Sequence, residues 1–198
     1  MTRVYLEQGR TWTFACAVDW PGWARRGKGD EAALEELSAY AGRYAAAMPG
    51  FQAGELHVVG TVPGNATTDF GAPDARGPWD EAPADVAVLA ERMEHCWAAF
   101  DRTVAEASAE LRKGPKGGGR DRDGVVAHVR EAERAYGSKL GVRVPPRTPW
   151  EEQRAAMSAA VLAGAPGAAW PVSYGVRRIA WHVLDHAWEI EDKDLTAR

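Results

Sequence analysis

Cysteine is scarce in this chain: only Cys16 and Cys96 occur, far apart in the sequence. They form no Cys-x-x-Cys pair, which excludes a thiolate zinc site, and they cannot supply the disulfide framework of a small secreted domain. Residues 1–7 also lack the long apolar stretch that a signal peptide or a membrane span requires. We therefore expect a cytoplasmic protein with no membrane partner.

Charge of one sign is not in excess either. The 24 Lys and Arg residues nearly balance the 28 Asp and Glu residues, and the formal net charge is −4. This balance argues against binding of nucleic acid by bulk electrostatics, so no nucleic-acid partner is expected. Aromatic side chains are plentiful by contrast, and the nine tryptophans indicate a use for flat, amphipathic rings.

The first sixty residues predict a small α+β unit. Two runs of β-branched and aromatic residues flank the turn-like Gln8-Gly9-Arg10, and this pattern predicts a β-hairpin. A third short strand is expected after Pro21-Gly22. Apolar residues then recur at helical spacing between Asp30, a suitable N-cap, and Pro49-Gly50. A closing strand at 55–62 completes the order strand, strand, strand, helix, strand.

The rest of the chain predicts helices. After a segment rich in Pro, Gly, Asp and Ala, which marks a linker, apolar residues recur every three or four positions in four stretches. Four such helices predict an antiparallel, up-and-down four-helix bundle. Gly117-Gly118-Gly119 follows a helix instead of a strand, which favours a loop or lid over a phosphate-binding turn. The expected helices are 84–111, 123–139, 150–163 and 173–192, and the expected units are 1–62, 63–82 and 83–198.

Helical geometry separates the five histidines. His95 falls opposite the apolar stripe of its helix and His57 sits in the closing strand, so neither is a candidate ligand. His128 lies in the apolar arc of the second bundle helix and is expected to face inward. His182 and His186 are four positions apart, which stacks two imidazoles on one face of the fourth helix, at the edge of its apolar arc. This position suits a shared metal ion with an open coordination site.

The spacing alone leaves other interpretations open. Inward histidines on different helices can instead be hydrogen-bonded core residues. Asp185 and Glu189 neighbour the histidines and can orient an imidazole or accept a proton as a general base, or they can belong to a solvated helix face. Arg177 and Arg178 can anchor a substrate carboxylate or be exposed charges at the start of the helix.

Two of the expected helices resemble the DinB-like (YfiT-like) metalloprotein superfamily. The stretch 123–136, DGVVAHVREAERAY, resembles its second helix, and 178–192, RIAWHVLDHAWEIED, resembles its fourth. The resemblance implies a four-helix bundle, often a dimer, in which His128, His182 and His186 bind a divalent metal. Zinc is the first candidate, and nickel, iron and copper share its preference for imidazole.

The resemblance implies several chemistries. Members of the superfamily include S-transferases that depend on mycothiol or bacillithiol, and maleylpyruvate isomerase. We therefore expect a metal-dependent transferase, isomerase or hydrolase that acts on a small molecule, with a thiol such as mycothiol as one cosubstrate option. Glu189 and Asp185 are its candidate catalytic residues.

Residues 14–37 resemble a second family, the HicB-like antitoxins, through a strand, a Pro-Gly turn, a strand and a helix. The chain shows no helix-turn-helix or ribbon-helix-helix segment that would bind DNA. An alternative function follows from this resemblance: a noncatalytic binding or interaction module that uses the HicB-like unit, with the bundle as its scaffold.

Overall fold

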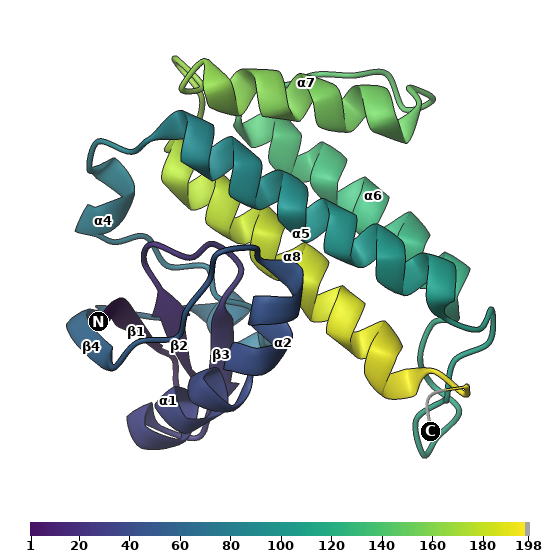
Figure 1. Cartoon of the computed structure of the whole chain (residues 1–198), viewed down its shortest axis with the longest axis horizontal. Helices are drawn as coiled ribbons and strands as arrows, with labels where there is room; N and C mark the ends of the chain where they lie inside the picture. Colours follow the sequence, from purple (N-terminus) through teal and green to yellow (C-terminus); the bar gives the residue numbers. More distant parts are fainter. Residues whose placement is uncertain (197–198) are drawn as a thin grey trace.

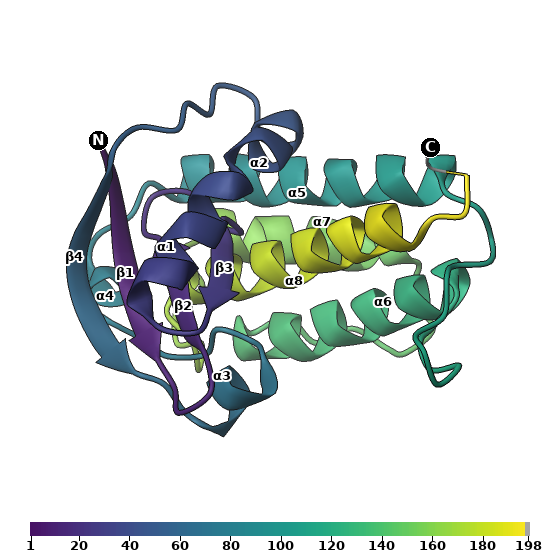
Figure 2. The ribbon, with the colours of Figure 1, turned by 90° about the horizontal axis from the view of Figure 1, so that it is seen from below.

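The structure, a computed structural model, describes residues 1–196. In this part of the chain a four-stranded mixed sheet and eight helices form an α+β fold, as expected (Figure 1). The sheet and two helices pack against one side of a group of four long helices (Figure 2). None of the helices in residues 1–196 combines the length and the apolar content needed to cross a membrane.

The sheet has the strand order β3-β2-β1-β4. Its first three strands form antiparallel pairs, whereas β4 runs parallel to β1 at the sheet edge. A parallel pair needs a long crossover, and helices α1 (Asp30–Ala39) and α2 (Ala41–Ala47) supply it. The predicted order of strands and helix is confirmed, although the helix is divided at Tyr40. The strands are β1 (Thr2–Gln8), β2 (Thr13–Ala17), β3 (Ala24–Gly27) and β4 (Leu56–Pro63).

Asp30 is not the helix N-cap that we expected. The N-cap of α1 is Gly29, whose φ of 91° lies in the left-handed region that favours glycine. The Asp30 carboxylate instead accepts hydrogen bonds from the side-chain amide of Gln8, 2.8 and 2.9 Å away. The side chain therefore connects the start of the helix to the end of β1.

Residues 63–82, expected as a linker, contain helices α3 (Ala66–Phe70) and α4 (Pro78–Glu81). The fully buried Glu7 carboxylate of β1 accepts hydrogen bonds from the backbone N–H groups of Asp74 (2.8 Å) and Ala75 (3.0 Å). A buried carboxylate must have its hydrogen-bond acceptors satisfied. The segment is thus attached directly to the sheet.

The four expected long helices are present. The first of them ends at Glu106, five residues earlier than expected. Leu111, the last apolar residue of the expected helix, is buried although it lies in the following loop. Helix α8 packs against both α5 and α6, and α7 packs against the same two helices from the other side. The helices are α5 (Val86–Glu106), α6 (Arg122–Lys139), α7 (Trp150–Leu162) and α8 (Val172–Lys193).

The expected alternation of helix directions is not observed between α6 and α7. Glu133 accepts a hydrogen bond from the indole of Trp150, and Gly137, one turn later, lies beside Met157. Because both residue numbers rise along the contact, α6 and α7 run parallel. Two consecutive helices can run parallel only if the connection between them returns along the length of the first helix. The 18-residue α6 is about 27 Å long, and the ten residues 140–149 can span about 33 Å when extended.

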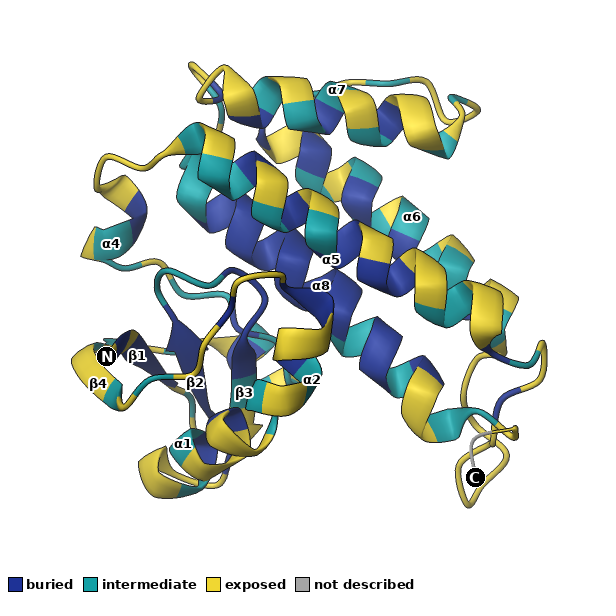
Figure 3. Cartoon of the chain, viewed as in Figure 1, coloured by how far each residue is buried: buried dark blue, intermediate teal, exposed yellow. Residues whose placement is uncertain are grey.

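Helix α8 lies between the sheet and the other long helices, and residues 174–184 are all buried (Figure 3). Trp181 packs edge-on against Phe14 of β2, with ring centroids 6.1 Å apart. The turn before β3 approaches α8 closely at Gly22, where a Cβ atom would lie 2.9 Å from Leu184. Its φ of 91° also requires glycine.

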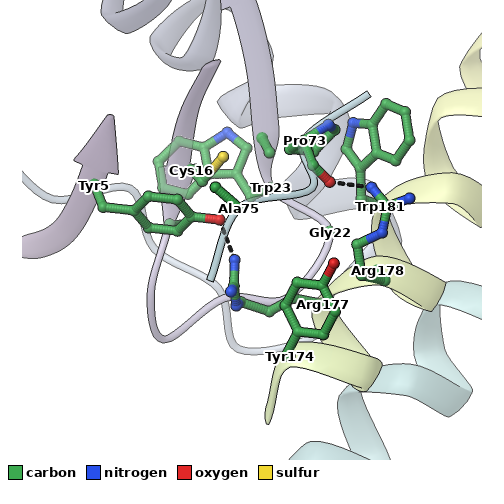
Figure 4. A pocket seen from close by; sticks show the side chains of 12 residues that line it. Tyr5, Cys16, Gly22, Trp23, Pro73, Ala75, Tyr174, Arg177, Arg178 and Trp181 are labelled. Atoms are coloured by element: carbon green, nitrogen blue, oxygen red, sulfur yellow. Dashed lines mark hydrogen bonds between the residues drawn. The ribbon is translucent and has the colours of Figure 1, made fainter. Parts of the chain in front are cut away.

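Two buried arginines of α8 attach the sheet and the 63–82 segment to the helix (Figure 4). Arg177 donates to Asp80 of α4, with Nε and Oδ1 3.0 Å apart, and to the Tyr5 hydroxyl of β1. Arg178 donates to the Pro73 carbonyl and lies 3.5 Å from the Asp74 carboxylate. The positive charge of each guanidinium is therefore balanced by a carboxylate in a region where water has little access.

The Arg177–Asp80 pair yields a stability prediction. Asp80→Asn removes the counter-charge from Arg177, whose side chain is 10% exposed. We therefore expect a loss of about 3–5 kcal/mol in the free energy of unfolding, measured by urea denaturation. The matched control is Asp19→Asn, which breaks the exposed pair with Arg3 and should change stability by less than about 1 kcal/mol. Equal effects of the two variants would contradict this assignment.

Candidate metal centre

Three histidines from two helices converge beside the buried half of α8. His182 and His186 lie one turn apart on α8, and His128 reaches them from the antiparallel α6. The centroids of the three rings lie 4.5–5.1 Å apart. The two histidines set aside from the sequence lie elsewhere: His57 is exposed on β4, and His95 faces Glu91 at 3.6 Å on α5. We refer to His128, His182 and His186 as the histidine triad.

The triad has the spacing of a ligand set. Each ring offers one nitrogen such that the three atoms lie within 4.8 Å of one another. The Nε2 atoms of His128 and His182 face each other at 3.3 Å. A tetrahedral ion with nitrogen ligands at 2.0–2.1 Å holds two such nitrogens about 3.3 Å apart. The residues present therefore fit a divalent metal, and three protein ligands leave a position for water or substrate.

His182 is the most constrained member of the triad. It is 8% exposed, and its Nδ1 atom is buried without a hydrogen-bond partner in residues 1–196. Burial, reinforced by the neighbouring His186 and His128, lowers the pKa of His182 to about 2. Burial and the adjacent His186 also lower the pKa of His128. Both rings are consequently neutral at physiological pH, which is the form that binds a metal.

Glu189 holds the third ring. Its Oε2 lies 2.7 Å from His186 Nδ1, and its other oxygen accepts a hydrogen bond from Lys193. The hydrogen bond from His186 lowers the pKa of Glu189 to about 2, with Lys193 contributing. The carboxylate can only accept, so His186 Nδ1 carries the proton in this hydrogen bond and Nε2 is the nitrogen available to an ion. A carboxylate this acidic is a weak base at neutral pH, so orienting His186 is the role that the geometry favours.

Asp185, the other candidate catalytic residue, points away from the triad. Its Oδ1 lies 2.9 Å from Nη1 of Arg25 on β3. The Arg25 guanidinium also lies over the Tyr40 ring, 3.8 Å from its centroid. The Asp185 side chain is 39% exposed, as the solvated-face interpretation expects, and its ion pair with Arg25 connects α8 to the sheet instead of orienting an imidazole.

Arg177 and Arg178 are not the exposed helix-start charges that the sequence allowed. Both are buried and bind Asp80, Asp74 and other groups of the protein. Arg178 is nevertheless one turn from His182, and its charge contributes to the low pKa of that ring. It belongs to the surroundings of the triad rather than to an open surface.

Two neighbours of the triad were not identified from the sequence. Tyr136 of α6 packs edge-on against His182, with ring centroids 5.7 Å apart. Its position two turns after His128 could have indicated this contact. Arg120 precedes α6 in a glycine-rich loop, and its charge lowers the pKa of both His128 and His182. No local pattern in the sequence places Arg120 beside them.

Comparison with known proteins gives no relative: no protein-family model, no curated protein and no solved structure matches the chain.

The low pKa of His182 predicts how stability depends on pH. In the unfolded chain this histidine takes up a proton below about pH 6.5, whereas the folded protein resists protonation down to about pH 2. The unfolded state thus binds more protons, and stability falls as pH falls below 6.5. We expect His182 to contribute a loss of about 2 kcal/mol between pH 7 and pH 5.

This contribution is measured by urea unfolding of chelator-treated protein at several pH values. His182→Gln should flatten the dependence between pH 7 and pH 5, and a His57→Gln variant is the matched control. A parent-like slope in His182→Gln would show that the ring is not held neutral.

Proposed function

We propose that this protein is a metal-dependent enzyme of the DinB-like (YfiT-like) type that acts on a small molecule. The histidine triad would bind one divalent ion, with zinc as the first candidate and nickel, iron or copper as others. The observation that carries this proposal is the convergence of three imidazole nitrogens within 4.8 Å. A hydrogen-bonded core would also explain His128 and His182 facing each other, but it does not require His186 to bring a third imidazole nitrogen to the same place.

A bound divalent metal lowers the pKa of water or a thiol and polarises a carbonyl group, which suits a transferase, isomerase or hydrolase. The protein's own residues have distinct parts in this proposal. The triad supplies neutral ligands, and Glu189 fixes the orientation of His186. His128 and His186 are half-buried, which supports a site at an edge of the bundle that a substrate would reach. A thiol cosubstrate such as mycothiol belongs to the proposal only through the family resemblance.

The proposal extends to the finer architecture. We assign α5, α6, α7 and α8 to a DinB-like four-helix bundle and the N-terminal sheet with its helices to a HicB-like unit. The element order in each part supports these assignments. A homodimer and a cytoplasmic location are also proposed, and no nucleic-acid partner is part of the account.

Metal analysis of the purified protein tests the proposal. The parent should contain close to one divalent ion per chain by elemental analysis, and His128→Ala, His182→Ala and His186→Ala should each lose most of it. His57→Ala and His95→Ala are matched controls that should keep it. Full metal content in the three triad variants would refute the site and favour the noncatalytic alternative, in which the HicB-like unit binds a partner.

Glu189 yields a separate prediction. Glu189→Gln removes the charged acceptor that orients His186, so we expect metal affinity to fall by about 10–100-fold, measured by competition with a chromophoric chelator. Glu191→Gln is the matched control, because Glu191 pairs with Arg43 instead. If Glu189→Gln bound metal as tightly as Glu191→Gln, the orienting role would be wrong.

A further inference from the structure

The loop between α5 and α6 is attached to the end of α8. The backbone N–H of Arg112 donates to the Lys193 carbonyl at 2.8 Å, and Leu111 forms a β-bridge with Asp194. At the other end of the loop, the Arg122 guanidinium donates to the Ala107 carbonyl at 2.9 Å. These contacts hold the glycine-rich segment expected as a loop or lid at the end of α8 that follows the triad.

Arg120 extends from this loop along the first turn of α6. A Cβ atom at Gly124 would lie 3.3 Å from Cβ of Arg120 and less than 4 Å from its Cγ and Cδ. The aliphatic part of Arg120 therefore occupies the space above Gly124. Since Gly124 precedes His128 by four positions, this face of α6 leads directly to the triad.

The positive charge of Arg120 is not neutralised by the protein. Nearby carboxylates have other partners, because Asp121 pairs with Lys113 and Asp123 pairs with Arg122. Arg120 itself forms no ion pair or side-chain hydrogen bond within residues 1–196. Arg178, the other arginine near His182, is already bound to Pro73 and Asp74.

The charges around the triad are unequal. Arg120 lies beside the turn of α6 that precedes His128, and Arg178 lies one turn before His182 on α8. Positive side chains therefore approach the triad from two elements. Of the acidic groups near His128, Glu189 is committed to His186 and Lys193. Glu131 lies one turn after His128 on α6 and is exposed to solvent. With a divalent ion added, the site would carry excess positive charge and would attract an anion.

We infer that Arg120 is a substrate-binding residue that selects small molecules with an oxyanion group, such as a carboxylate or phosphate, beside the metal. This inference rests on the proposed function, since it assumes that the triad holds an ion. A guanidinium presents a planar fork of donors that matches two oxygens of such a group. The neutral imidazoles would hold the ion while Arg120 holds the charged end of the substrate.

The test uses the full chain loaded with Co²⁺, whose visible absorption reports on ligands at the metal. Acetate and inorganic phosphate are titrated separately into the parent, Arg120→Gln, Arg120→Lys and Lys116→Gln. We expect Arg120→Gln to bind at least one anion about tenfold more weakly, with Co²⁺ affinity no lower than in the parent. Arg120→Lys should be intermediate, and the loop control Lys116→Gln should match the parent.

The outcomes separate the two levels of the account. A larger loss for acetate indicates a carboxylate substrate, and a larger loss for phosphate indicates a phosphorylated one. Equal anion affinity in the parent and Arg120→Gln, with Co²⁺ bound through the triad, would overturn the role of Arg120 alone. Failure of Co²⁺ to bind the parent, or unchanged binding in His128→Ala, would overturn the proposed function and this inference with it.

Discussion

Helix α8 is covered by the sheet on one side and by α5 and α6 on the other, so each polar side chain in its buried half needs a partner inside the protein. Arg177 and Arg178 find theirs in α4 and in the segment before it. His182 Nδ1 has no partner in residues 1–196, as is also true of Arg178 Nε and Trp181 Nε1 on the same helix. What distinguishes His182 is that the nitrogens of two further imidazoles converge on it, with Nε2 of His128 3.3 Å from its own Nε2.

The same constraint explains how the N-terminal sheet relates to the triad. Asp185, Arg25 and the rings of Tyr40 and Trp188 form one cluster on the face of α8 turned toward the sheet. The triad occupies the face turned toward α6. The sheet therefore fixes the rotation of α8, and that rotation presents His182 and His186 to His128. The N-terminal sheet and the long helices, which the sequence predicts as separate units, together determine how the three histidines are arranged.

Local patterns were enough to predict the long helices and the helix faces that carry the three histidines. The spacing left a hydrogen-bonded core open, and the assignment of the three histidines to one metal site came from the family resemblance. His182 and His186 share a helix face because they are four positions apart. His128 points inward because it lies in the apolar arc of α6. Long-range choices were not predictable in this way. The parallel course of α7 depends on how residues 140–149 cross the molecule, and the partner of Asp185 lies 160 positions away in the sequence. The charge of Arg120 reaches the triad from a loop without periodicity.

The central claim, that three imidazoles form one metal site, is tested most directly by X-ray absorption spectroscopy of the zinc-loaded protein. The account predicts a shell of nitrogen and oxygen atoms at about 2.0–2.1 Å with the multiple scattering of three imidazole rings. A sulfur shell near 2.3 Å would contradict it, since the two cysteines are buried away from the triad. A spectrum without imidazole scattering would contradict it as well.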